Sequence, residues 1–309
     1  MTKIALTGAT GGYGSLATQK LIALGRAEDL ILITRSPDKL ADLARLGCDV
    51  RYGDYDKPET MIAAMRGADR LLLISGTRVG HRIAQHKAAI DGAVAAGVRH
   101  IAYTGFVVTD PACPAIVVPD HNGTEQLVRE SGLDWTFLRD GHYADAMILL
   151  AGPGYIAAGR WLTSTNGGRE AMVWREDCVD CAVAVLTQDG HENKAYGITG
   201  PNLENFAEIA AMLSEVSGRE VVVEETDDAG MFAHFDALGI PRHPVDDQTV
   251  ANIPYCSTDM VSFERTIREG FAEIRTDDVE LLTGRKPRSV REMIDRNAEF
   301  LRSVVTGTQ

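Results

Sequence analysis

Short apolar runs alternate with amphipathic stretches along the first half of the chain. A short apolar run bounded by glycine or polar residues predicts a buried strand, and apolar residues spaced three and four apart predict a helix that packs on the strands. This alternation is typical of βαβ units, which build a parallel sheet with helices on both faces. We expect a first strand before Gly8, then strands at Leu30–Thr34, Asp49–Tyr52, Arg70–Ile74, His100–Tyr103 and Asp134–Arg139. Helices are expected at about Gly12–Leu24, Asp38–Leu46, Pro58–Met65 and Val79–Ala96, the last with Ile83, His86, Lys87, Ile90 and Val94 towards the sheet.

The second half of the chain departs from this strict alternation. Gly152-Pro153-Gly154 and Asn166-Gly167-Gly168 interrupt a region that predicts short strands. The prolines of Pro241–Pro254 indicate a loop that could serve as a lid. The elements expected around these breaks are helices at Arg175–Leu186, Asn205–Ser217 and Asp227–Ile240, and strands at Lys194–Ile198 and Val221–Glu225.

The C-terminal stretch Ser289–Val305 predicts an amphipathic helix. Ser289 and Glu292 have the spacing of a capping box. The residues expected to face inward are Met293, Ile294, Phe300 and Leu301. Taken together, the pattern predicts an α/β fold with a doubly wound parallel sheet in residues 1–150. A smaller α/β part is expected in residues 151–309, some of whose segments return to the first domain.

Three glycines, Gly8, Gly11 and Gly14, directly follow the first predicted strand. The first permits a sharp exit from the strand, the second lets the backbone approach a pyrophosphate, and the third lets the next helix pack closely on the sheet. That helix would direct its first N–H groups and its positive dipole end at the phosphates. The strand before and the helix after supply the context that a dinucleotide site requires. We therefore predict a Rossmann-like dinucleotide-binding turn, to which Thr10, Gly12 and Tyr13 also belong.

The residue at the end of the second predicted strand distinguishes the two nicotinamide cofactors. An acidic side chain there pairs with a free ribose 2′-hydroxyl, whereas arginine accommodates a 2′-phosphate. This chain has Arg35, followed by Ser36 and Lys39, so a guanidinium, a hydroxyl and an ammonium group could meet a phosphate. The sequence therefore predicts NADPH (NADP+) rather than NADH. The alternative is that Arg35 and Lys39 are solvated charges at a helix start.

Other candidate cofactor contacts follow predicted strands, because ligands of open parallel sheets bind beyond the carboxyl ends of the strands. Asp54 follows the third strand, where it could face the adenine amino group or form a solvated turn. Later strands end at Ser75-Gly76 and at Thr104-Gly105. The small residues of the first pair would permit close approach of the middle of the cofactor.

The net charge of −13 and the pI near 5.1 argue against direct nucleic-acid binding, which needs a basic surface. No apolar run approaches the length of a membrane-spanning helix and no signal peptide precedes the first strand, so we expect a cytoplasmic protein without a membrane partner. Five scattered cysteines agree with a reducing compartment. Cys178 and Cys181 form a Cys-x-x-Cys pair at a helix start without a second ligand pair, so no redox or metal site is predicted.

The catalytic pair of ordinary short-chain reductases is missing from this chain. In those enzymes the lysine of a Tyr-x-x-x-Lys pair lowers the pKa of the tyrosine, which then passes a proton to a carbonyl oxygen. The helix expected to carry the pair has His121 and Glu125 at that spacing. The chain is therefore either a non-catalytic nucleotide sensor or a reductase whose substrate needs no strong general acid.

The chain resembles the NmrA-like group of atypical short-chain dehydrogenases/reductases, and within it most closely the type 2 NAD(P)H:quinone oxidoreductases. The resemblance covers most of the chain and depends on the order and spacing of its motifs. Triphenylmethane reductases resemble the same group. The matching segments are Thr7–Gly14, Leu71–Ser75, Ala96–Thr104, His121–Glu125, Trp135–Tyr143, Arg175–Asp177, Tyr196–Pro201, Thr276–Val279 and Thr283–Arg285.

The resemblance implies a Rossmann-like domain that holds NADPH and a smaller C-terminal part that closes over the nicotinamide, with a flat acceptor in the cleft between them. Hydride transfer to a quinone gives a hydroquinone anion that water or a weak donor can protonate, which would account for the missing tyrosine. The candidate donors or orienting residues are His121, His142 and Tyr143, and the candidate aromatic walls are Phe106, Tyr143 and Trp174. Each histidine could instead be a hydrogen-bonded structural residue, and each aromatic could belong to the core.

Two functions follow from these observations. The first is an NADPH-dependent oxidoreductase that delivers a hydride to a quinone or a similar flat conjugated acceptor. The second is an NAD(P)-sensing regulatory protein of the NmrA type that binds a protein partner. The closer motif similarity to quinone reductases favours the enzyme, and a homodimer is compatible with either function.

Overall fold

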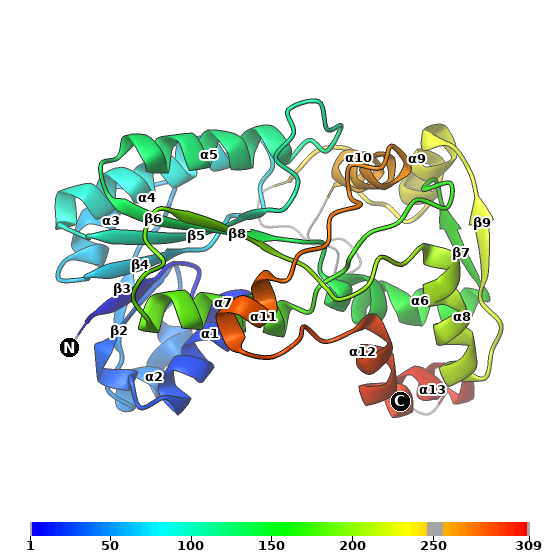
Figure 1. Cartoon of the computed structure of the whole chain (residues 1–309), viewed down its shortest axis with the longest axis horizontal. Helices are drawn as coiled ribbons and strands as arrows, with labels where there is room; N and C mark the ends of the chain where they lie inside the picture. The colour runs from blue at the N-terminus through cyan, green and yellow to red at the C-terminus, as the bar shows by residue number, and fades with distance from the viewer. Residues whose placement is uncertain (1, 246–255, 308–309) are drawn as a thin grey trace. The chain divides into compact units, whose positions relative to one another are not determined.

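The computed structural model describes residues 2–245 and 256–307 (Figure 1). The chain divides into two compact units that interleave along the sequence. The first unit contains the residues up to Phe106, together with Pro119–Arg139 and Cys178–Tyr196. The second unit contains Val107–Val118, Asp140–Asp177 and the residues from Gly197 onward.

The first unit is built on a seven-stranded sheet with the order β3-β2-β1-β4-β5-β6-β8. Strand β1 pairs in parallel with β2 on one side and with β4 on the other, so Leu6 lies opposite both Leu32 and Leu72. The strand order therefore reverses at β1, which is the switch point of a doubly wound nucleotide-binding sheet. The predicted fold class is confirmed. The strands are β1 (Ile4–Leu6), β2 (Leu30–Thr34), β3 (Asp49–Tyr52), β4 (Arg70–Leu73), β5 (His100–Phe106), β6 (Asp134–Asp140) and β8 (Lys194–Ile198).

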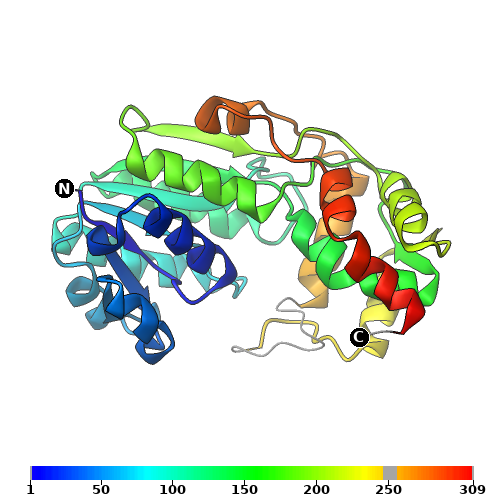
Figure 2. The same cartoon turned by 90° about the horizontal axis from the view of Figure 1, so that it is seen from below.

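Helices cover both faces of this sheet, as the alternating pattern predicts. Helices α3 (Pro58–Met65), α4 (Arg82–Ala96) and α5 (Val118–Glu130) lie on one face, and α1 (Gly12–Ala23), α2 (Ala41–Arg45) and α7 (Arg175–Thr187) lie on the other (Figure 1). Seen from below, α1 and α7 lie in front of the strands (Figure 2). The central strands are buried from both sides, and Leu6, Leu32 and Leu72 are fully covered. Such strands are almost wholly apolar because neither face meets water.

The second unit has a small two-stranded parallel sheet of β7 (Arg160–Thr163) and β9 (Val222–Glu225). The ring of Trp161 lies at the centre of its core, stacked on Tyr155 at 4.3 Å and on Phe206 at 4.5 Å between ring centroids. The helices of the unit are a π-helical turn η3 (Ala146–Ala151), α6 (Gly152–Ala158), α8 (Phe206–Ser217), α9 (Asp228–Ala237), α10 (Ser257–Arg268), α11 (Asp278–Thr283), α12 (Val290–Arg296) and α13 (Ala298–Thr306).

Several local predictions are wrong. The Gly152-Pro153-Gly154 segment opens α6 rather than a turn between strands, because proline in the first helical turn does not interrupt the hydrogen-bond ladder. The C-terminal stretch forms two helices that break at Asn297, although the predicted capping box at Ser289 is present. Phe300 is 43% exposed rather than inward.

The predicted face of α4 is also partly wrong. Ile83, Lys87 and Val94 are exposed, whereas the helix buries Ala88, Ala89, Ala93 and Gly92 together with His86 and Ile90. Small residues allow α4 to approach α3 closely, since a Cβ atom on Gly92 would lie 2.7 Å from that of Met61. Most of the proposed lid at Pro241–Pro254, namely the part from residue 246 onward, lies outside the described residues.

Candidate nucleotide-binding site

The turn between β1 and α1 has the geometry that its glycines predict. Gly8 has a φ of +61°, a left-handed conformation that glycine adopts without steric cost. The N–H of Gly11 donates to the carbonyl oxygen of Gly8 at 2.9 Å, which closes the turn. A Cβ atom on Gly14 would lie 2.9 Å from the Cα of Ala9 and closer still to the carbonyl oxygen of Gly8. Only glycine at position 14 lets the helix start so close to the strand.

Helix α1 begins without a side-chain cap. Its N-cap residue is Gly11, and its first turn contains no acidic side chain. The first N–H groups of an α-helix have no acceptor within the helix, and they carry the positive end of its dipole. The exposed turn, the positive helix end and the close backbone approach together fit a pyrophosphate group.

The end of β2 carries a small network of hydroxyl groups next to this turn. The hydroxyl of Thr10 lies 3.1 Å from that of Thr34, which also accepts the backbone N–H of Ser36 at 3.1 Å. Arg35 follows directly and is exposed, as is Lys39 in the short helix η2 (Pro37–Leu40). The segment that follows β2 therefore carries two basic side chains and Ser36 within five positions.

Asp54 follows β3 and lies in a turn, as one of its two interpretations predicts, although its side chain is only 14% exposed. Its carboxylate accepts the backbone N–H of Asp56 at 3.1 Å, and its own N–H donates to the hydroxyl of Thr60 at 3.1 Å. The hydroxyl of Tyr52 lies 3.4 Å from the same carboxylate. A role toward adenine remains a prediction.

The loop after β4 is held by Thr104, a predicted cofactor contact, and by two buried side chains of α4 whose contact with this loop the sequence did not predict. The N–H of Ser75 donates to the hydroxyl of Thr104 at 2.9 Å, and the N–H of Gly76 donates to Nε2 of His86 at 3.1 Å. Arg82 is 6% exposed and donates through Nε to the carbonyl oxygen of Gly76 at 2.6 Å. The signal was present in the sequence, since Arg82 and His86 stand four residues apart on one face of an otherwise alanine-rich helix.

His121 is buried beside β5. Its Nδ1 lies 2.8 Å from the hydroxyl of Tyr103, and its ring lies 6.2 Å from that of Phe106. Burial, followed by the charge of Arg82, lowers its pKa well below the usual value, so the imidazole is neutral near pH 7. Phe106 is 8% exposed. Gly105 lies next to Glu125, since a Cβ atom there would come within 3.7 Å of the carboxylate.

Glu125, at the position where the catalytic lysine of ordinary short-chain reductases is expected, has a structural role instead. Its buried carboxylate accepts two hydrogen bonds from Arg139 at 2.8 Å each, and one from Arg129 at 2.9 Å. The two bonds from Arg139 join α5 to β6 and hold the helix on the sheet, whereas the bond from Arg129 lies within α5.

His142 follows β6 and belongs to the second unit. Its Nδ1 lies 3.3 Å from a carboxylate oxygen of Glu170, and its ring stacks on Phe263 at 5.2 Å between ring centroids. Burial alone would lower the pKa of His142, but the charges of Glu170, Asp259 and Glu264 outweigh it and raise the pKa above the usual value. The side chain is 24% exposed, so Glu170 favours the protonated form of an imidazole that solvent can still reach.

Tyr143 and Trp174 also belong to the second unit. The hydroxyl of Tyr143 donates to Asp140 at 2.7 Å, and the guanidinium of Arg175 lies 5.2 Å above its ring. Trp174 is 4% exposed and donates through Nε1 to the carbonyl oxygen of Ser289 at 2.9 Å. Its ring lies under the guanidinium groups of Arg288 and Arg296. Trp174 therefore packs within the core of its own unit.

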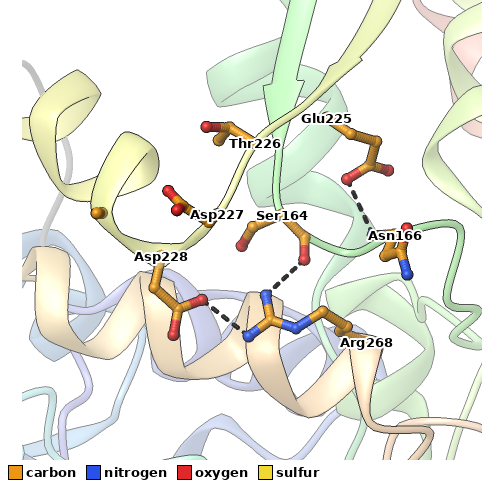
Figure 3. A pocket seen from close by; sticks show the side chains of 8 residues that line it. Ser164, Asn166, Glu225, Thr226, Asp227, Asp228 and Arg268 are labelled. Atoms are coloured by element: carbon orange, nitrogen blue, oxygen red, sulfur yellow. Dashed lines mark hydrogen bonds and ion pairs between the residues drawn. The ribbon is translucent and has the colours of Figure 1, made fainter.

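A hollow of about 460 Å³ opens in the second unit between β7, β9, α9 and α10 (Figure 3). Its charged side chains already have partners. Glu225 accepts the N–H of Asn166 at 2.9 Å, and Asp228 lies 2.8 Å from Arg268, which also donates to the carbonyl oxygen of Ser164. Asp227 caps α9. No side chain from the predicted site lines this hollow.

The reversal of strand order at β1, with a left-handed glycine and an uncapped helix start at that point, defines a dinucleotide-binding protein of the Rossmann type. A family model described as NAD(P)H-binding matches residues 8–189, and the chain belongs to this family. Among residues 2–245 and 256–307, no helix has both the length and the apolar character needed to cross a bilayer.

Known proteins resemble the chain over most of its length. Quinone oxidoreductase 2 of Escherichia coli is 34% identical over 77% of this chain and 82% of its own. The crystal structure of triphenylmethane reductase from Citrobacter sp. with NADP(H) has a TM-score of 0.84 and 32% identity, and covers 95% of this chain and 99% of its own. The NADPH complex of an NADPH-dependent quinone oxidoreductase from Escherichia coli has a TM-score of 0.85 and 29% identity, with coverage of 95% and 99%.

These similarities confirm the predicted resemblance to NmrA-like reductases and to quinone oxidoreductases. They also confirm the predicted cofactor, since the family binds NAD(P)H and both solved relatives hold NADP(H). The relatives support an oxidoreductase. The roles of the individual site residues stay predictions.

Proposed function

We propose that this protein is an NADPH-dependent reductase that transfers a hydride to a quinone or a related flat, conjugated acceptor. The observation that carries the proposal is the glycine turn of Gly8, Gly11 and Gly14 at the switch point of the sheet, followed on the neighbouring strand by the exposed Arg35. The solved relatives named for quinone and triphenylmethane reduction match almost the whole chain, which supports this class of acceptor.

The basic residues after β2 would select the phosphorylated cofactor. The guanidinium of Arg35 can form a bidentate contact with a 2′-phosphate, and the ammonium group of Lys39 and the hydroxyl of Ser36 can complete the site. The helix start at Gly11 would bind the pyrophosphate. The loop at Ser75–Gly76, beyond the carboxyl end of β4, would bind the nicotinamide half. Thr104 and Gly105, expected after a strand that ends at Tyr103, lie instead within the last residues of β5, where they would face the same half of the cofactor.

Bound at this position, the reduced nicotinamide supplies the hydride. Reduction of a quinone also requires a proton on its oxygen. We assign the delivery of this proton to His142. Glu170 holds the imidazole through Nδ1, and among the described residues no partner occupies Nε2. Tyr143, bonded to Asp140, would orient the acceptor rather than lose its own proton. His121 is less suited, because its buried imidazole is neutral and bonded to Tyr103.

The proposal is tested by mixing the purified protein with NADPH and a panel of simple quinones and dyes. Loss of the absorbance of the reduced nicotinamide is followed against a control without protein. Steady turnover supports the reductase, and the relative rates identify the acceptor class. Tight binding of NADPH without turnover on any acceptor would contradict it and would favour the NAD(P)-sensing regulator instead.

A further inference from the structure

The irregular segment between β4 and α4 is anchored almost entirely by side chains. The backbone N–H of Ile74 donates to the hydroxyl of Thr7 at 3.0 Å, and its carbonyl oxygen accepts the hydroxyl of Tyr55 at 2.9 Å. The next two N–H groups donate to Thr104 and to His86. A loop whose backbone groups are bonded in this way has one conformation, because each missing bond would leave a partly buried polar group unpaired.

The orientation of His86 in this network follows from its neighbours. The hydroxyl of Thr124 donates its hydrogen to the carbonyl oxygen of Asp120 at 2.8 Å, so its oxygen must accept from Nδ1–H of His86 at 2.9 Å. Nε2 then carries no proton and accepts the N–H of Gly76 at 3.1 Å. Burial, followed by the charge of Arg82, lowers the pKa of His86 to about 3, so the ring is neutral at physiological pH.

The protein side of Gly76 is tightly packed. A Cβ atom at this position would lie 3.2 Å from the amide oxygen of Gln85 and 4.0 Å from Nε2 of His86. Arg82 clamps the same residue from its carbonyl side, and its Nη1 lies 3.8 Å from Asp120. Gly76 therefore lies against α4, and its hydrogen bonds to His86 and Arg82 fix the orientation of its backbone.

We propose that His86 is a positioning residue of the cofactor site, and that Thr124 fixes the tautomer through which it acts. The inference rests on the proposed function, because it requires the dinucleotide to lie against Ser75–Gly76. His86 itself contacts no reacting atom in this account. It holds the loop only while Nε2 is an acceptor, and the Thr124 hydroxyl enforces that state.

The chain contains a matched control for this arrangement. His100 is a second buried histidine in the same unit, with Nε2 at 2.8 Å from the hydroxyl of Thr136, which in turn donates to the carbonyl oxygen of His191 at 2.7 Å. Both pairs combine a buried imidazole with a threonine that donates to a backbone oxygen. The two pairs differ in position. His86 also accepts a hydrogen bond from the loop beyond the carboxyl end of β4, whereas His100 is the first residue of β5 and lies at the opposite end of the sheet's strands.

The test compares Thr124→Val with Thr136→Val, and uses Thr124→Ser as the rescue. NADPH affinity is measured by fluorescence titration, thermal unfolding is recorded for each variant, and the protonated ring nitrogen of His86 is identified by ¹⁵N NMR. We expect Thr124→Val to weaken NADPH about tenfold and to increase the Nε2–H tautomer. Thr124→Ser should bind as the wild type does, and Thr136→Val should lose similar stability without loss of affinity.

Unchanged NADPH affinity in Thr124→Val would overturn the inference. A loss of NADPH affinity in Thr136→Val equal to that in Thr124→Val would also overturn it, because the loss would then reflect general destabilisation. The readout is binding, so it is independent of turnover. If the wild-type protein binds NADPH but reduces no acceptor, the proposed reductase function is wrong. The comparison of the threonine variants would still test whether His86 positions the cofactor loop.

Discussion

Nδ1 of His142 lies 3.3 Å from a carboxylate oxygen of Glu170. Glu170 is 5% exposed, whereas the imidazole is 24% exposed. Asp259 and Glu264 add further negative charge around the ring, and Phe263 stacks on it. The carboxylates therefore favour the protonated form of an imidazole that remains accessible to solvent. This arrangement suits a group that must protonate a hydroquinone anion.

Glu170→Gln should move the pH dependence of reduction to lower pH. An acid acts while it is protonated, so turnover is lost as the pH rises through the pKa of His142. Because Glu170 is the largest of the charges that raise this pKa, its removal should lower the pKa and shift the falling limb of the kcat profile in the same direction. The measurement is kcat for a quinone as a function of pH.

His142→Gln serves as the control for that profile. It should lower kcat by about tenfold or more and remove the limb, since a general acid typically contributes a factor of this order or larger. If the limb stays at the same pH in Glu170→Gln, or survives in His142→Gln, then another group delivers the proton. Tyr143 would be the next candidate, because it is the other predicted donor in this unit.

Arg35→Ala should weaken NADPH by about tenfold to a hundredfold and leave NADH almost unchanged. Hydrogen bonds to a charged phosphate are stronger than neutral ones, and NADH lacks the group that would receive them. The dissociation constants for both cofactors can be measured by titration. Arg45→Ala is the matched control, because Arg45 is an exposed arginine of the same unit that pairs with Asp42. Equal weakening of both cofactors would refute this account of specificity.

The sequence was sufficient to predict the first unit because its signals are local. Strands such as Leu30–Thr34 are apolar throughout, and the glycine turn has a fixed spacing, so neither depends on distant contacts. The face of α4 was predicted less well. Ile83 and Val94 are exposed although they are large and apolar, and half of the residues that the helix buries are alanine or glycine. A search for periodic large apolar residues does not detect such small buried ones.

The polar network of the candidate site could not be predicted in the same way. His86 contacts Gly76 ten residues earlier and Thr124 thirty-eight residues later, and only the fold brings the three together. Glu170 reaches His142 across twenty-eight residues for the same reason. The sequence does not show which groups will contact a histidine. Its pKa and tautomer can therefore be assigned only after the fold has placed those groups.

Gly14→Ala should abolish NADPH binding and destabilise the first unit. The added methyl group would lie within 2.9 Å of the backbone of Ala9, and backbone atoms cannot move aside as a flexible side chain can. Gly154→Ala is the control, because a Cβ atom there meets nothing within 4 Å and alanine favours a helix such as α6. Calorimetry and cofactor titration should show loss in the first variant and unchanged or higher stability in the second. A Gly14→Ala protein that binds normally would show that the turn has more room than its geometry indicates.

Glu264→Gln should stabilise the protein at high pH and have little effect at low pH. The carboxyl of Glu264 is 9% exposed and accepts the N–H of Ser164 at 2.7 Å, and burial raises its pKa to about 7. A carboxyl whose pKa is higher in the folded than in the unfolded protein binds a proton more tightly when folded. Its contribution to stability is therefore complete below the unfolded value near 4.5 and is lost as the pH rises through about 7.

Above that pH the folded protein carries a buried carboxylate at a cost of roughly 3 kcal/mol relative to the protonated form. Glutamine keeps the shape and the acceptor oxygen without the charge, so the free energies of unfolding of the two proteins should separate between about pH 4.5 and 7 and stay apart above it. Denaturant unfolding at several pH values measures this directly. Glu273→Gln, at an exposed carboxylate of the same unit, should show no such divergence. Parallel curves for Glu264→Gln and the wild type would mean that the carboxyl ionises without cost, through solvent that reaches it when the second unit fluctuates.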